Sequence, residues 1–302
     1  MEHDVSRGVR AGVVAYLVWG LLTVYWKQLT DFDPFELIGW RVAMAAIVMT
    51  GVITWHGRWP VMRAAFRDRN LVGRLVFAAV LLTVNWTTYV WAVVNDHVIE
   101  TALGYFMSPL GTMAVGVLVL GERLTPLKKA SIGFAVMAVV VLTMSYGQVP
   151  VVAVLIGASW TTYGLTKRRV PLTAIESLAG ETFVLVVPAT AIVLWGASRT
   201  DGVPATASTV EWALVFGTGI VTAVPLLLFA FAAKRVPFTL LGPLTYLVPI
   251  INFGLGWMVY GETLPPDRVI GFALVWIALA LATFDTAQSS RRVRNPQPAA
   301  AT

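Results

Sequence analysis

The sequence contains no cysteine and few charged residues. Without a thiol, the chain forms no disulfide, no thiolate nucleophile and no cysteine-based metal site. Charged residues make up 13% of its 302 residues, whereas soluble domains carry about a quarter. Hydrophobic residues make up 57%, and a bilayer is the solvent that suits so much apolar side chain. These features predict an integral membrane protein.

Motifs of intramembrane enzymes and ATP-driven pumps are also missing. The three histidines, His3, His56 and His97, fall outside apolar runs or at their ends, and no HExxH or paired-aspartate motif occurs in a run. No P-loop sequence is present. The N-terminus has no small-residue cleavage site of a signal peptide, so we expect the first apolar run to remain as a helix. We therefore expect no catalytic residue, no cofactor and no metal.

Apolar runs long enough to cross a bilayer recur along the whole chain. A spanning helix needs about 20 mostly apolar residues. Short connections with turn residues or charges separate the runs. The predicted fold is an all-α integral membrane protein of ten transmembrane helices, at 9–27, 34–55, 71–94, 99–120, 128–146, 149–166, 175–196, 211–233, 239–260 and 266–285.

Lysine and arginine alternate between the connections in a way that predicts orientation. The N-terminal tail, the even-numbered connections and the C-terminal tail hold 18 of the 22, and the odd-numbered connections hold three. An excess of basic residues marks the cytoplasmic side. Both termini are therefore predicted in the cytoplasm of a multi-pass protein of a bacterial inner membrane. The net charge of +6 lies in these clusters rather than on one face, so we expect no nucleic-acid partner.

The two halves of the chain match at a constant offset of 140 residues. Seven residues of the segment 109–126, from Pro109 to Pro126, recur between Pro249 and Pro266. Each half holds five predicted spans, and an odd number inverts the second half in the membrane. The predicted domains are two five-helix repeats, 8–146 and 147–286, and a disordered cytoplasmic tail, 287–302. Inverted repeats are typical of secondary transporters, whose substrate site lies near the midplane between the repeats.

Four sequence runs resemble the EamA family of the drug/metabolite transporter superfamily, and within it the RarD-type permeases. The runs are NWTTYVWAVVN (85–95), ETALGYFMSPLGTMAVGVLVLGER (100–123), GIVTAVPL (219–226) and VYGE (259–262). The resemblance covers nearly the whole chain. It implies ten helices, two EamA repeats and transport of a small metabolite or drug-like solute, with export as the direction. It implies no particular substrate.

Two charged residues lie deep in predicted spans at equivalent places in the two repeats. Arg41 lies roughly 10 Å below the outer face, and Glu181 is its counterpart at the 140-residue offset. Charges at such depth usually face a cavity or a partner. The two side chains are hypothesised to bind substrate or couple transport to protons, by meeting directly or by holding a zwitterion between them. The alternative is a structural ion pair that aligns the repeats.

Polar and aromatic residues of two neighbouring spans are further candidates for substrate binding. Asn85, Trp86 and Tyr89 share one broad face of the third span. Tyr105 of the fourth span is expected to face the same cavity, with Tyr246 beside the residue equivalent to it. Asparagine also bridges helices, and aromatic residues also form interfacial belts, so a structural role stays open.

Prolines and helix-end glutamates are candidates for hinges or gates. Pro109, Pro225 and Pro249 fall inside predicted spans, where proline frees a carbonyl and bends a helix. Glu122 and Glu262 end spans on opposite sides of the membrane and are read as terminus or gate residues. Fixed kinks and simple helix ends are the alternatives.

Three functions are compatible with these patterns. A secondary transporter fits the inverted repeat and the deep charges, with a small solute, the lipid bilayer and protons as partners and a homodimer left open. A structural or assembly partner without flux would not need the deep charges. An intramembrane enzyme lacks its motif.

Overall fold

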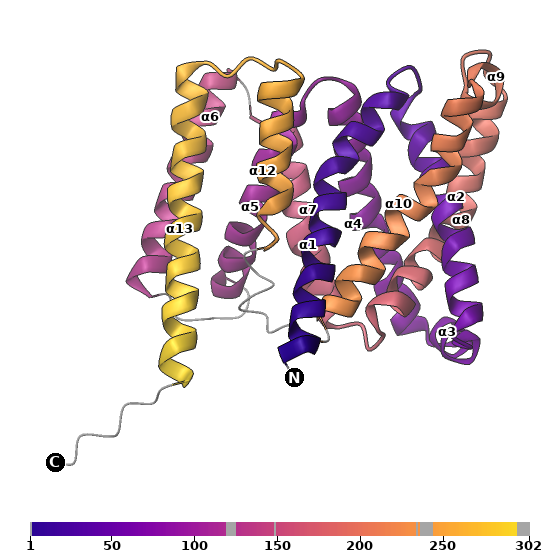
Figure 1. Cartoon of the computed structure of the whole chain (residues 1–302), viewed down its shortest axis with the longest axis horizontal. Coiled ribbons are helices and arrows are strands. Elements are labelled where there is room, and N and C mark those ends of the chain that lie inside the picture. The colour runs from indigo at the N-terminus through magenta and orange to yellow at the C-terminus, as the bar shows by residue number, and fades with distance from the viewer. Residues whose placement is uncertain (1, 119–124, 148, 234, 236–243, 295–302) are drawn as a thin grey trace.

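The computed structural model describes residues 2–118, 125–147, 149–233, 235 and 244–294, and within this part of the chain all regular structure is helical. The helices pack side by side in one bundle (Figure 1). In chain order they are α1 (Glu2–Trp26), the 3-10 turn η1 (Lys27–Leu29), α2 (Pro34–Trp55), α3 (Trp59–Arg67), α4 (Arg69–Val94), α5 (Val98–Leu118), α6 (Pro126–Tyr146), α7 (Val151–Arg168), α8 (Ala174–Ala197), α9 (Val203–Thr206), α10 (Thr209–Ala233), α12 (Leu247–Gly254), the π-helical turn η2 (Leu255–Val259) and α13 (Pro266–Arg294).

Seven helices of the described residues are long and apolar enough to cross a membrane. They contain or coincide with Ser6–Leu29, Pro34–Trp55, Arg69–Val94, Pro126–Ser145, Ala174–Ala197, Thr209–Phe229 and Pro266–Asp285. The predicted count of ten therefore stays a prediction.

The other three predicted spans coincide with α5, with α7 and with the segment that holds α12. α7 has 18 residues and ends in the polar run Thr166–Arg168. The predicted span 239–260 is described from residue 244 onward, where α12 begins at Leu247 and the helix changes to π-helical geometry at Leu255. The prolines and glycines around this segment favour such irregular backbone.

Local capping signals fix where several helices begin. The Asp33 carboxylate accepts hydrogen bonds from the N–H groups of Phe35 and Glu36, and Pro34 occupies the first turn of α2. Thr173 and Glu176 form a reciprocal capping box at the start of α8. Each cap satisfies N–H groups that have no partner within the helix.

The packing partners of the helices are exchanged between the two halves of the chain. α1 packs against α10 and α12, and the equivalent α7 packs against α4 and α5. α2 packs against its own equivalent, α8, and α6 packs against its own equivalent, α13. A two-fold relation between the halves requires this pattern.

The outside of the bundle is apolar and the inside holds polar groups. Met144 and Val187 are more than three-quarters exposed, whereas Arg41, Asn85 and Glu181 are buried. A surface of this kind suits hydrocarbon rather than water. α1 begins and α13 ends at the lower edge of Figure 1, where α3 also lies. The connections after η1, α4 and η2 lie at the upper edge.

Candidate functional site

A cavity of about 510 Å³ lies between the two halves of the chain. Its walls come from α1, α2, α4 and α5 of the first half and from α7, α8, α10 and α12 of the second, with Thr245 just before α12. Aromatic side chains form much of the wall, and six of them are Tyr16, Trp19, Trp86, Trp160, Tyr163 and Phe229. Pockets that bind small molecules combine such apolar walls with a few convergent polar groups.

Arg41 is the most deeply buried cation of this wall. Its side chain projects from α2, is 4% exposed, and donates from Nε to Thr222 Oγ1 of α10 at 3.1 Å. The guanidinium lies over the ring of Trp86 at 4.1 Å and over that of Trp26 at 5.4 Å. Its Nη1 is buried without a hydrogen-bond partner, and no carboxylate pairs with it among the described residues. An unpaired buried charge is energetically costly.

Glu181 is fully buried and pairs with Lys167 rather than with Arg41. Its Oε1 accepts from Lys167 Nζ at 2.7 Å and from Ser177 Oγ at 2.9 Å, and its Oε2 accepts from Tyr163 at 3.0 Å. Tyr163 and Lys167 line the cavity, and Glu181 stands behind them. The structure therefore does not bring the two deep charges into direct contact.

The candidates of α4 and α5 line the cavity together. Asn85 donates from Nδ2 to the Ile156 carbonyl and to Ser159 Oγ, both at 3.1 Å, and so ties α4 to α7. Tyr105 donates to Asn85 Oδ1 at 3.4 Å. Trp86 lies under Arg41. These residues shape one wall, and Asn85 bridges helices at the same time.

Hydrogen bonds close the cavity toward the upper edge. Thr23 Oγ1 lies 2.8 Å from Tyr89 Oη and donates to Asn252 Oδ1 at 2.9 Å. Asn252 Nδ2 donates in turn to Thr101 Oγ1 at 3.2 Å. These four side chains, which we call the upper seal, are all buried and join α1, α4, α5 and α12.

A second layer lies beyond the upper seal. The Glu262 carboxylate accepts from the backbone N–H groups of Val98 and Ile99 at 2.6 and 2.9 Å, and Lys27 pairs with Asp96. Glu262, which follows η2 in the chain, thus caps the N-terminus of α5.

Within the residues that the structure describes, the cavity is accessible from the lower edge. Ala174 and Thr245, which line it there, are exposed, and the Lys167 side chain is 23% exposed. The residues around Arg41 are buried. Water therefore reaches the site from one side only within the described part of the chain.

Some predicted site residues lie elsewhere. Tyr246 lies outside the central cavity, in a groove with Phe106 and Trp276 where Thr283 Oγ1 donates to its hydroxyl at 3.5 Å. Its neighbour Thr245 lines the cavity instead. Consecutive residues on a helical turn point about 100° apart around the axis, so neighbouring side chains can face different sides.

The structure places the proline and glutamate candidates in different parts of the helices. Pro225 lies inside α10 and Pro249 in the first turn of α12, where a missing N–H costs no helical bond. Pro188, inside α8, was not predicted. The backbone of Pro109 belongs to α5, but its side chain and all of Glu122 lie outside the described residues.

Lys167 was missed as a site residue because it was counted only among the cytoplasmic topology signals. Its long side chain turns back from the end of α7 to Glu181. The sequence shows that Lys167 is equivalent to Lys27 at the 140-residue offset, but it does not show the direction of the Lys167 side chain. Among the described residues, no group of three or more acidic or histidine side chains could hold a metal ion.

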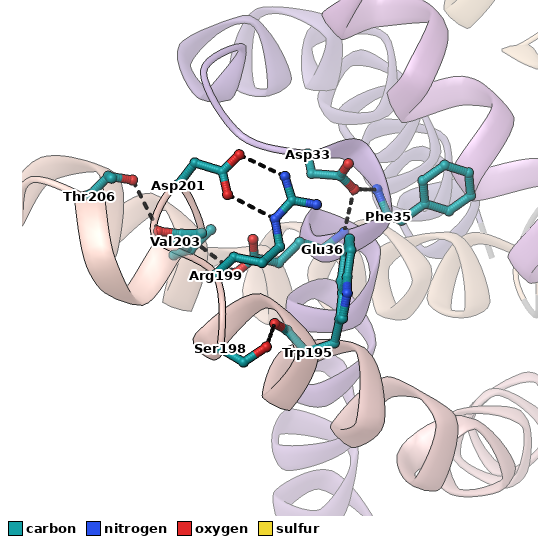
Figure 2. A network of polar contacts seen from close by, with 10 residues as sticks. Asp33, Phe35, Glu36, Trp195, Ser198, Arg199, Asp201, Val203 and Thr206 are labelled. Carbon is teal, nitrogen blue, oxygen red and sulfur yellow. Dashed lines mark hydrogen bonds and ion pairs between the residues drawn. The ribbon is translucent and has the colours of Figure 1, made fainter.

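A separate polar cluster holds the upper edge together away from the cavity (Figure 2). Arg199 pairs with Asp201 through two hydrogen bonds of 2.8 and 2.7 Å. Glu36 accepts from the backbone N–H of Val203 at 3.0 Å, and Asp33 caps α2 beside it. The Glu36 contact joins α2 to the start of α9, and the Arg199–Asp201 pair lies within the α8–α9 connection. Both lie at the ends of the helices that carry Arg41 and Glu181.

Comparison with known proteins places this geometry in a family context. Residues 6–144 and 149–284 each match the model of the EamA-like transporter family. The chain is 39% identical over 300 residues to Protein RarD of Streptomyces exfoliatus, which covers 99% of this chain and 95% of that protein. It is 35% identical to the uncharacterized transporter PA0485 of Pseudomonas aeruginosa over 98% of both chains. A solved crystal structure matches with a TM-score of 0.59 and 21% identity over 92% of this chain and 98% of its own, a likeness that concerns the fold alone.

Proposed function

We propose an alternating-access carrier mechanism for this chain, which belongs to the EamA-like transporter family and is related to RarD over nearly its full length. The family is one of transporters and not of enzymes. The observation that carries the mechanism is the central cavity, which lies between the halves, is closed at the upper edge and is accessible at the lower edge. The solute binds there, and transport exchanges the open edge for the closed one.

The two EamA domains form inverted five-helix repeats with ten spans in this proposal. The exchanged packing partners of α1 and α7, and the self-pairing of α2 with α8, support a two-fold axis between the repeats. An inverted repeat carries two alternative arrangements of the same contacts, one open to each side. The seal that Thr23, Tyr89 and Asn252 form at the upper edge would then open as the lower edge closes.

The lower edge is proposed as the cytoplasmic side of a bacterial inner membrane. The Arg-rich α3 lies at this edge, as do the start of α1 and the end of α13. Basic residues gather on the cytoplasmic side. The conformation described here would therefore face inward. Such a state occurs in both import and export, and export is the direction that we propose from the family resemblance.

Proton coupling is proposed at Glu181. This carboxylate is buried, is held by Lys167, Tyr163 and Ser177, and stands behind the cavity wall. Protonation would release Lys167 toward the cavity, which changes the charge that a solute meets there. A gradient of protons can thereby bias the two arrangements of the bundle.

Flux in proteoliposomes tests the carrier. The screen covers amino acids, aromatic metabolites and chloramphenicol-like drugs with an imposed pH gradient. The native chain contains no cysteine, so the double variant Thr23→Cys/Asn252→Cys introduces the only thiols. We expect saturable flux that oxidation of this pair abolishes and a reductant restores, because a disulfide would hold the upper seal shut.

The two single-cysteine variants are the controls and should keep their flux under oxidation. Absence of flux for every solute from correctly folded protein would contradict the transport proposal. Flux that persists through a fully formed disulfide would contradict the opening of the upper seal.

A further inference from the structure

We propose that the cavity selects an organic monoanion with an aromatic body, whose carboxylate binds Arg41; this inference rests on the proposed function. It concerns the chemical class of the solute, which neither the family nor the relatives specify. The charge balance of the cavity, the geometry of Arg41 and the nature of the walls support it independently.

The charge balance favours one negative charge. Arg41 and Lys167 are the two charged residues that line the cavity within the described part of the chain. Glu181 already neutralises Lys167 at 2.7 Å. Arg41 has no such partner among the described residues, so this part of the wall presents one uncompensated positive charge. A cationic solute would be repelled, and a solute with two or more negative charges would bury charge without a partner.

The geometry of Arg41 favours a planar oxyanion. Its Nε is engaged by Thr222, and the guanidinium plane rests on Trp86 at 4.1 Å. These contacts fix the orientation of the head group and leave the buried Nη1 free. A guanidinium held in this way binds a carboxylate through its fork of N–H groups, at little cost in side-chain entropy.

The walls favour a flat apolar body attached to that carboxylate. Trp160 packs against Tyr163 with ring centroids 5.6 Å apart and against Tyr105 at 6.4 Å. Trp19 and Phe229 approach each other at 5.8 Å. Aromatic rings bind other rings by offset stacking or edge-to-face contact. A cavity of about 510 Å³ accommodates one or two rings with a short chain.

Paired neutral and anionic probes test this inference by binding, independently of flux. Purified protein in nanodiscs is titrated calorimetrically with 3-phenylpropionate and indole-3-acetate and with the primary amide of each acid. 3-Phenylpropylamine supplies the cation. We expect each acid to bind the native protein at least about 10-fold more tightly than its amide, because hydrogen bonds to charged groups are stronger than neutral ones. The amine should bind more weakly still.

Substitutions of Arg41 test whether this residue causes the preference for the acid over the amide. Arg41→Gln should reduce the ratio of acid to amide affinity to about one, and Arg41→Lys should keep part of it, since charge without the fork is retained. Arg63→Gln removes the same charge from the exposed surface of α3 and should leave the ratio unchanged.

Three results would overturn the inference. They are equal affinity of acid and amide for the native protein, no binding of either acid, and an acid preference that survives in folded Arg41→Gln. Acid preference without any flux would instead support the anion site and count against the carrier. Flux of neutral or cationic solutes that does not depend on Arg41 would support the carrier and count against the anion site.

Discussion

Lys167 Nζ lies 2.7 Å from Glu181 Oε1, and the two members of this pair differ in their access to water. Glu181 is fully buried, whereas the Lys167 side chain is 23% exposed at the lower end of the cavity. Glu181 also accepts hydrogen bonds from Tyr163 and Ser177. Loss of one partner therefore has unequal consequences for the other.

Lys167→Met should destabilise the protein more than Glu181→Gln. The first change leaves a buried carboxylate without its cation, which costs about 3 kcal/mol or more in the free energy of unfolding. The second leaves an ammonium that can turn toward water, and we expect a loss of about 1–2 kcal/mol. The double variant should recover part of the loss, as a double-mutant cycle by thermal unfolding would measure. Equal losses in both single variants, with no coupling, would contradict this account.

Single cysteines should map the two edges of the bundle. Arg63→Cys places a thiol on exposed α3 at the lower edge, and Ala205→Cys places one on exposed α9 at the upper edge. We expect an impermeant maleimide to label Ala205→Cys in intact spheroplasts and Arg63→Cys only in inverted vesicles. The cysteine-free native chain gives the background. The opposite labelling would reverse the proposed orientation.

Gly219 should be intolerant of alanine because α10 lies directly on α2 there. A Cβ at this position would approach the Met44 carbonyl oxygen to 2.5 Å and the Met44 Cβ to 3.0 Å. We expect Gly219→Ala to lower stability by about 1–3 kcal/mol, as overpacking does. Gly133→Ala, on the exposed side of α6 with nothing within 4 Å, is the matched control and should be neutral or slightly stabilising. Similar effects of both changes on apparent Tm would contradict the close approach.

Glu262 should make stability depend on pH in a direction set by its burial. Burial raises the pKa of the Glu262 carboxyl, although the N–H groups at the start of α5 oppose the shift. A carboxyl with a raised pKa binds more protons in the folded state than in the unfolded state. Its contribution to the free energy of unfolding is therefore full below the ordinary pKa and declines as pH rises through the raised value.

The comparison of native protein with Glu262→Gln measures this contribution. The amide cannot ionise. The apparent Tm of the native protein minus that of Glu262→Gln should therefore decrease as pH rises from about 4 to about 7. A difference in apparent Tm that is constant over this range, or that increases with pH, would contradict a raised pKa.

Much of the candidate cavity was accessible from sequence because deep charges and polar residues are rare in apolar spans. Arg41, Asn85, Trp86, Tyr89 and Tyr105 were selected in that way, and all line the central cavity. Thr245, the residue equivalent to Tyr105, lines the cavity, whereas the side chain of its neighbour Tyr246 lies in a different groove, because repeat alignment gives a position along a helix and not the direction of a neighbouring side chain. The functional roles of all these residues stay predictions.

Composition and the long apolar runs were enough to determine the helical membrane class, because a bilayer imposes long apolar helices that are visible one segment at a time. The EamA family was indicated by the resemblance of four sequence runs, and the family comparison confirms it. Which charges neutralise each other was decided only by tertiary structure. Arg41 and Glu181 occupy equivalent positions in the two repeats, yet Glu181 pairs with Lys167 from the end of α7, and Arg41 lies over Trp86 without a carboxylate partner in the part of the chain that the structure describes. That outcome depends on distances between helices far apart in the chain and on the path of flexible side chains, which no linear pattern encodes.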